Sequence, residues 1–165
     1  VSAMAAVVAS LTKILVSRTG LRDEGTTILC DALRESKVTK VQELDLSLNG
    51  IGPEGAKAVA AMAAVVASLT ECNVRGNALD GDSATLLAKV AREKRVMIFG
   101  IKHHQTEAIF QGQGLGPVDA ILIASDLAVS TSLTPLDVEY NSLGEEGRAV
   151  LRKTVEVRSG FELKL

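Results

Sequence analysis

The chain has 165 residues, enough for one domain, and it is 47% hydrophobic but only 2% aromatic, so its core must be built from aliphatic side chains. A net charge of −2 gives no basic surface for nucleic acid or for an anionic membrane, and so few aromatic residues argue against base stacking. No uncharged apolar run approaches the roughly 18 residues of a membrane span. The sequence therefore predicts neither a nucleic-acid partner nor a membrane partner.

The first residues of the chain duplicate a later segment. The sequence AMAAVVASLT occurs at 3–12 and again, unchanged, at 61–70, where a predicted helix ends and a strand begins. Residues 1–10 are therefore interpreted as a partial helix, the last part of a repeat. Residues 1–12 carry no charge, and a helix with an uncovered apolar side favours pairing with another chain. We expect a homo-oligomer formed through this N-terminal helix.

A repeating unit accounts for the chain that follows. Leu44 and Leu46 alternate with polar residues, which is typical of a short strand with one buried side. An asparagine after the strand can bind the backbone groups of the turn, and Pro53 suits the first turn of the alanine-rich helix that comes next. The same offsets recur in the units that begin at 11, 41 and 69, as Leu11, Ile14, Val16, Thr19, Leu21 and Gly25; Val41, Leu44, Leu46, Asn49, Ile51 and Gly55; and Leu69, Cys72, Val74, Asn77, Leu79 and Ser83.

Two registers compete for the fourth unit. A start at Val96 places His104 at the asparagine position, whereas a start at Gln105 places Gln113 there and aligns 114–134 with 50–70. The second register is preferred, and it leaves an apolar insertion at about 96–104 that is expected to pack down, as an added strand in one alternative. A fifth unit begins at Leu133 and a closing strand lies near 160, so the whole chain 1–165 is expected to form a single solenoid domain.

The spacing L-x-x-L-x-L-x-x-N-x-L, followed by a helix that begins G-x-x-x-L, resembles the ribonuclease-inhibitor-like subfamily of leucine-rich repeats. That subfamily includes the sensor regions of intracellular NLR-type receptors and the activators of Ran-type GTPases. The resemblance implies an α/β solenoid shaped as a horseshoe. A parallel β-sheet would line the concave face, helices would cover the convex face, and protein ligands would bind on the concave face or at the strand ends.

Residues that could support chemistry are sparse, so we expect no enzyme activity, no cofactor and no metal. His103 and His104 are adjacent and would point to opposite sides of an extended segment, and the glycines of GQGLGP at 112–117 lack the Lys-Ser/Thr of a phosphate loop. Cys72 is expected to be buried and Cys30 to be accessible, without a basic neighbour that would activate its thiol. Two thiols without a disulfide framework are compatible with a cytoplasmic protein.

Strand side chains that point away from the core define the expected binding face. Glu43, Glu71 and Glu107 are expected on consecutive strands, where an acidic column would favour a basic partner surface, although splaying of the three carboxylates into water is the alternative. Tyr140 and Leu48 are the expected hot spots. The candidate partner-binding residues are Glu43, Asp45, Leu48, Glu71, Asn73, Arg75, Glu107, Ile109, Asp137, Glu139 and Tyr140.

The function predicted from the sequence is that of a protein-interaction scaffold. One alternative is a GTPase-activating module for a small G protein, with Arg18 or Arg75 as the arginine lent to the partner's site. Another is a structural fragment of a longer repeat array. The sequence does not identify the partner.

Overall fold

The computed structural model describes residues 11–36 and 38–165, in which short strands alternate with helices. The strands are β1 (Lys13–Leu15), β2 (Glu43–Asp45), β3 (Glu71–Asn73), β4 (Ala108–Ile109), β5 (Pro135–Asp137) and β6 (Glu162–Lys164). The helices are α2 (Arg22–Glu35), α3 (Pro53–Val65), α4 (Gly81–Lys94), α5 (Pro117–Val129) and α6 (Gly144–Val155). The expected N-terminal helix at 1–10 lies outside the described residues.

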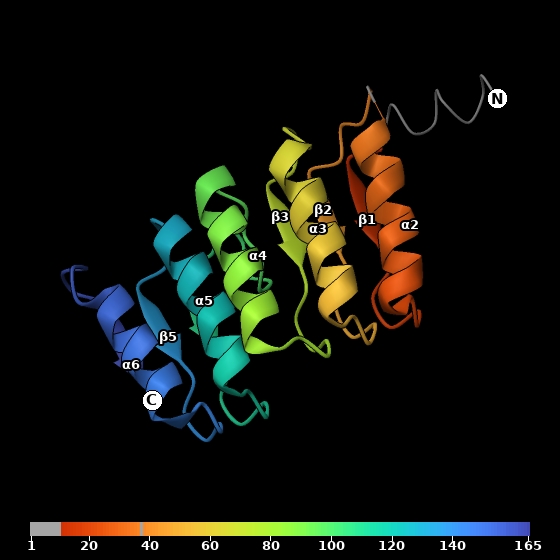
Figure 1. Cartoon of the computed structure of the whole chain (residues 1–165). Helices are drawn as coiled ribbons and strands as arrows, with labels where there is room; N and C mark the ends of the chain where they lie inside the picture. Colours follow the sequence, from red (N-terminus) through yellow and green to blue (C-terminus); the bar gives the residue numbers. More distant parts are fainter. Residues whose placement is uncertain (1–10, 37) are drawn as a thin grey trace.

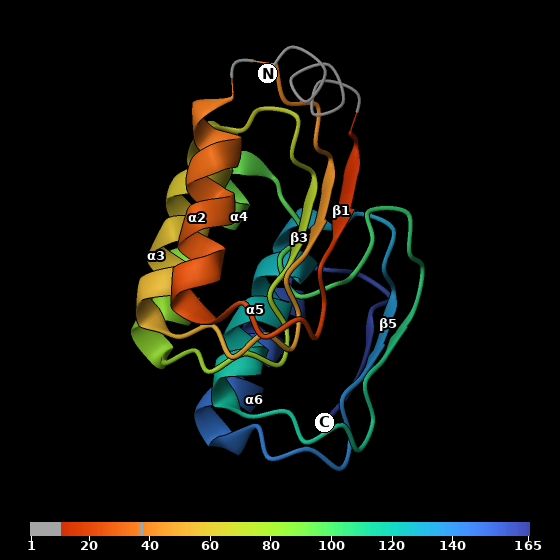
Figure 2. The same ribbon diagram turned by 90° about the vertical axis from the view of Figure 1, so that its right-hand side faces the viewer.

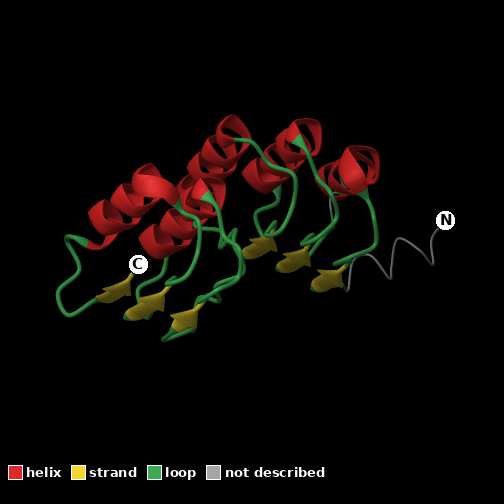
Figure 3. Cartoon of the chain, turned by 90° about the horizontal axis from the view of Figure 1, so that it is seen from below, coloured by secondary structure: helices red, strands yellow, loops and turns green. Residues whose placement is uncertain are grey.

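The strands and the helices form two layers of a solenoid. The helices lie in chain order (Figure 1), and each packs against the next one along the chain. Seen from below, the strands line the inner side of an arch whose outer side is helical (Figure 3). This is the predicted α/β arrangement, because a three-residue strand and one helix cannot bury their own apolar sides and must stack on neighbours. Among the described residues, no helix is both long enough and apolar enough to cross a membrane.

The strands form two parallel sheets rather than one continuous sheet. The first has the order β1-β2-β3 and the second the order β4-β5-β6, and the second stands apart from the first in the side view (Figure 2). Leu44 lies opposite Cys72 in the first sheet and Ala108 lies opposite Leu136 in the second. The register that starts at Gln105 gives Ala108 and Leu136 the same repeat position. The break between the sheets falls at the insertion 96–104.

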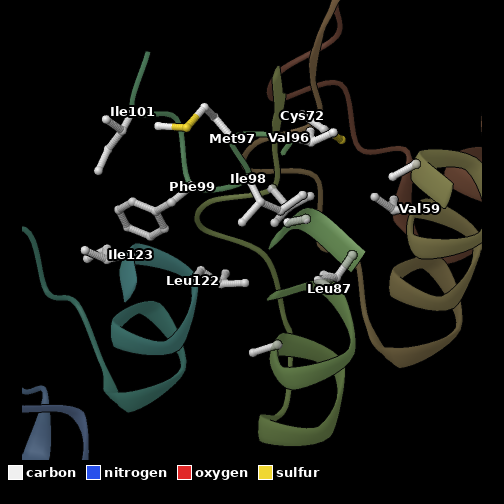
Figure 4. Packing of buried hydrophobic residues seen from close by; sticks show 14 of the residues in the cluster. Val59, Cys72, Leu87, Val96, Met97, Ile98, Phe99, Ile101, Leu122 and Ile123 are labelled. Carbon is white, nitrogen blue, oxygen red and sulfur yellow. The ribbon is translucent and has the colours of Figure 1, made fainter. Parts of the chain in front are cut away.

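The insertion packs into the core and ends the first sheet. Met97 forms an isolated parallel bridge with Glu71, and its carbonyl accepts the Cys72 N–H at 2.7 Å. Phe99 and Ile98 are fully buried; Figure 4 shows Phe99 on the side of Ile123 of α5 and Ile98 on the side of Leu87 of α4. Apolar residues of the insertion thus join the core between the third and the fourth repeats.

Asparagines tie each turn to the neighbouring repeat. Asn49 accepts the Thr19 N–H at 2.9 Å and donates to the Val16 carbonyl at 2.9 Å. Asn77 and Asn141 make equivalent bonds, in which each Oδ1 accepts a backbone N–H of the preceding repeat at 2.9 Å. Backbone groups that cannot reach water inside the solenoid are satisfied in this way.

Close packing between helices explains a glycine of the repeat pattern. An added Cβ at Gly55 would lie 2.6 Å from Ile51 Cγ2 and 2.7 Å from Asp23 Oδ1. The same Asp23 Oδ1 accepts the Gly52 N–H at 2.6 Å, so it cannot move away without losing that bond. Gly55 therefore allows α3 to approach α2, which holds neighbouring strands at hydrogen-bonding distance.

Candidate protein-binding face

The inner strand face brings together part of the predicted binding set. Glu43 lies opposite Glu71 and Asp45 lies opposite Asn73 in the first sheet, and Asn73 Nδ2 donates to Asp45 Oδ1 at 3.2 Å. Ile109 and Asp137 lie opposite one another in the second sheet. The predicted residues therefore occupy two groups, one on each sheet.

Glu107 does not continue the acidic column, because the next strand position after Glu71 is taken by the backbone of Met97. The eight or so extra residues of the insertion displace the fourth unit. Glu107 comes directly before β4, in the other sheet, and is exposed. The prediction of three glutamates on consecutive strands therefore holds for Glu43 and Glu71 and is wrong for Glu107.

Lysines neutralise the two glutamates that do lie side by side. Lys102, from the insertion, contacts the carboxylates of both Glu43 and Glu71, and Lys13 lies 2.7 Å from the second oxygen of Glu43. The hydrogen bonds from Lys102 and from Lys13 hold the pKa of Glu43 below its ordinary value. These carboxylates are already paired within the chain, which weakens the argument for a basic partner at this point.

Large apolar side chains remain exposed on the same face. Ile109 is 61% exposed, Tyr140 is 83% exposed and Leu48 is 45% exposed. Tyr140 and Leu48 belong to the turns that follow β5 and β2, and both have a left-handed backbone, with φ of 56° and 57°. The backbone therefore holds both side chains at the carboxyl ends of the strands.

Arg75 has a structural environment that sequence reasoning missed. Its guanidinium carbon lies 5.4 Å from the ring centroid of Phe99 and 5.2 Å from that of Phe110. The two rings pack edge to face at 5.3 Å, and the guanidinium also donates to Gln113. Arg75 thus connects the first sheet, the insertion and the second sheet. The clue in the sequence is that Phe99 and Phe110 are two of its four aromatic residues.

Two hollows open on this side of the molecule. One of about 220 Å³ is lined by Glu43, Glu71 and Lys102 together with Asp45, and its charges are largely paired. The other, of about 390 Å³, lies at the carboxyl ends of the strands. It is lined by Arg18, Ser47, Leu48, Asn73, Arg75, Gly76, Gln113, Gly114, Leu115 and Asp119.

Cysteine and metal chemistry finds little support. Cys30 is buried, contrary to the expectation of an accessible thiol, because its position on α2 faces the core. Burial raises the pKa of the Cys30 thiol to about 12 and also raises that of Cys72, so neither thiol is primed to react. Within 11–36 and 38–165, no three side chains of His, Cys, Asp or Glu form a group able to hold a metal ion.

Asp126 is the buried polar residue that sequence reasoning overlooked. Its carboxylate on α5 accepts the N–H groups of Ile98 at 2.5 Å and of Phe99 at 2.9 Å, with that of Ile101 at 3.4 Å. Burial raises the pKa of Asp126 to about 7. The alignment of 114–134 with 50–70 places Asp126 at the position of the buried Met62. An acidic residue at a buried position of the repeat indicates that its carboxylate has hydrogen-bond partners within the chain.

Comparisons with known proteins agree on one type of architecture. A family model described as "Leucine Rich repeat" matches residues 39–60. Mouse (Mus musculus) "NACHT, LRR and PYD domains-containing protein 12" is 31% identical over 134 residues, which are 79% of this chain and 12% of that protein. The tropomodulin C-terminal domain of Caenorhabditis elegans superposes with a TM-score of 0.56 at 16% identity, over 90% of this chain and 84% of that one.

Proposed function

Because the chain is a leucine-rich-repeat protein, similar to NACHT, LRR and PYD domains-containing protein 12, we propose that it is a scaffold that binds a partner protein through its inner strand face. Repeats of this kind serve as protein-interaction modules, which supports the general function. The chain spans only 12% of the length of that relative, so the surface that binds is argued from the geometry of this chain alone.

The observation that carries the proposal is the set of exposed apolar side chains on a backbone whose polar groups are already satisfied. Ile109, Leu48 and Tyr140 project from strands or from turns that hydrogen bonds fix between repeats. Asp45 and Asn73, on the same sheet as the turn that carries Leu48, are bonded to one another. A partner can cover these apolar groups without ordering the protein further, which limits the entropy cost of binding.

Matched isoleucine substitutions test the face. Ile109→Ala removes an apolar side chain that is 61% exposed on the strand layer, whereas Ile28→Ala removes one that is 65% exposed on helix α2. With a partner isolated by pull-down, Ile109→Ala and Tyr140→Ala should each weaken binding by about 10-fold, the scale of a hot-spot residue. Ile28→Ala should change the affinity less than about two-fold. Unchanged affinity in both strand-face variants would remove this face from consideration.

A GTPase-activating role makes a different prediction. Arg75 packs on the contacting rings of Phe99 and Phe110, so it is poorly placed to extend into another protein's active site, while Arg18 is exposed. If the captured partner is a small G protein, a GTP-hydrolysis assay with wild type and Arg18→Ala separates the two functions. A scaffold leaves the hydrolysis rate unchanged, and an activator raises it in a way that depends on Arg18.

Two further proposals concern the assembly and the compartment of the chain. Self-association through the N-terminal helix falls on residues 1–10, outside the described residues, and light scattering across a wide concentration range tests it. A cytoplasmic location is supported by the two free thiols, both buried in the core.

A further inference from the structure

The hollow at the carboxyl ends of β1–β3 holds an imbalance of charge. Arg18 and Arg75 both line it, and the carboxylate that shares the lining is that of Asp119. One oxygen of Asp119 already accepts the Gly116 N–H at 2.8 Å. In the part of the chain that the structure describes, neither arginine forms an ion pair. The hollow is therefore positive in net charge.

Arg75 is held in place before any ligand arrives. Its guanidinium carbon lies to one side of the edge-to-face ring pair, 5.4 Å from the centroid of Phe99 and 5.2 Å from that of Phe110, and Gln113 accepts one of its N–H groups. A guanidinium has five N–H donors in a fixed fork, so donors remain for a ligand. Its flat geometry matches a carboxylate, and because its position is already set, little side-chain entropy is lost on binding.

Three acidic residues on the first sheet lie outside this hollow. Asp45 lines the other hollow, and its Oδ1 already accepts the Ser47 N–H and a bond from Asn73. Glu43 and Glu71 are paired with Lys13 and Lys102, which lie on the face of the strands and not at their carboxyl ends. The charge left for a partner at this site is therefore positive, whereas the row of glutamates predicted a negative one.

We propose that the hollow lined by Arg18 and Arg75 receives an aspartate or glutamate side chain of the partner protein. The inference rests on the proposed scaffold function and adds the chemistry of one contact. Leu48, which lines the same hollow and is 45% exposed, provides an apolar wall beside the two arginines. An acidic residue next to an apolar one therefore fits the site.

The test uses the full chain and a defined probe. An acetylated, amidated tri-glutamate peptide is titrated at low ionic strength while the Nε–H signals of the arginine side chains are followed by NMR. A tri-lysine peptide of the same length and inorganic phosphate serve as separate titrants. Arg18→Gln and Arg75→Gln remove the two charges, and Arg92→Gln on α4, exposed and outside the hollow, is the matched control. The Arg18 variant keeps the cation–π contacts of Arg75, so it remains informative if Arg75→Gln is unstable.

The tri-glutamate peptide should shift the Arg75 and Arg18 signals with a Kd on the order of 1 mM, and each hollow variant should weaken binding about 3- to 10-fold. Arg92→Gln should leave the Kd unchanged. Shifts with tri-lysine instead, shifts with phosphate but not with tri-glutamate, or no shift of either arginine would each overturn the inference.

The isolated partner distinguishes this inference from the scaffold function itself. If Ile109→Ala weakens partner binding and neither arginine variant does, the acidic contact is wrong and the scaffold function stands. If none of these variants weakens it, both proposals fail.

Discussion

The third residue after each of the strands β1 to β5 adopts a left-handed backbone, whatever its side chain. The five equivalent residues are Arg18, Leu48, Gly76, Gly112 and Tyr140, with φ between 56° and 70°. The backbone of the next repeat holds this conformation: the N–H groups of Arg18 and Leu48 donate to the carbonyls of Ser47 and Arg75 at 3.1 and 3.0 Å. Glycine suits the position sterically, so a leucine or a tyrosine there is strained and points to a role beyond folding.

Opposite substitutions at two of these residues should differ in their effect on stability, and only the change from glycine should lower it. Tyr140→Gly relieves the left-handed strain of an 83% exposed side chain, so the free energy of unfolding should stay equal or rise by about 1 kcal/mol. Gly76 has a φ of 70°, and Gly76→Ala introduces a Cβ at 2.6 Å from Leu48 Cδ2. This substitution should lower the free energy of unfolding by about 1–3 kcal/mol. Urea denaturation measures both. A clear loss of stability in Tyr140→Gly would show that Tyr140 supports the fold.

The insertion and helix α5 act together as one element that closes the first sheet. Met97 adds its backbone to β3, and the N–H groups of Ile98, Phe99 and Ile101 turn to the carboxylate of Asp126. An edge left open at this point would expose unpaired backbone groups to another chain. A single side chain from the next repeat therefore performs the task that asparagines perform elsewhere in the solenoid.

Because of Asp126, the stability of the protein is predicted to depend on pH. Burial raises the pKa of Asp126 from 3.8 to about 7, so between these values the folded state binds one more proton than the unfolded state. The free energy of unfolding therefore decreases as pH rises through this window. The total decrease due to Asp126 is on the order of 2–4 kcal/mol. Asp126→Asn removes this slope and is less stable at every pH, because its NH₂ group faces a backbone N–H donor.

Thermal unfolding of wild type and Asp126→Asn at several pH values measures the effect. The two proteins share every other ionisable group, so the difference between the two curves isolates Asp126. The difference in stability should be larger at pH 5 than at pH 8. An equal difference at both values would contradict the raised pKa.

At the scale of the whole molecule, the two sheets depend on one junction. Each helix packs on its neighbours in the row, α4 on α5 included, but strand pairing stops between β3 and β4. Phe99, Phe110 and Arg75 bridge this gap, and Phe99 is fully buried. In a linear array, stability is nearly a sum of units and of neighbour contacts, so this junction decides whether the halves unfold together.

Phe99→Ala should uncouple the two halves. The loss of a buried phenylalanine lowers stability by about 3–5 kcal/mol, and because the loss falls on the junction, unfolding should separate into two steps. Hydrogen exchange should show one half opening while the other stays protected. Phe161→Ala, at the half-buried C-terminal end, is the control and should only loosen β6. A single cooperative transition in Phe99→Ala would contradict the idea of a junction.

The repeat spacing by itself determined the solenoid, the inward-facing residues and the asparagine bonds, because each depends on a local pattern that recurs and that stacking alone completes. The break in the sheet was decided by tertiary structure, together with the pairing of Lys102 with Glu43, 59 residues away, and the bonds from Asp126 to the insertion. These contacts join residues distant in sequence and each occurs once, so no repeating pattern in the sequence predicts them. The sign of the charge at the carboxyl ends of the strands follows from the same cause, since it depends on which ionic groups find partners after the chain has folded.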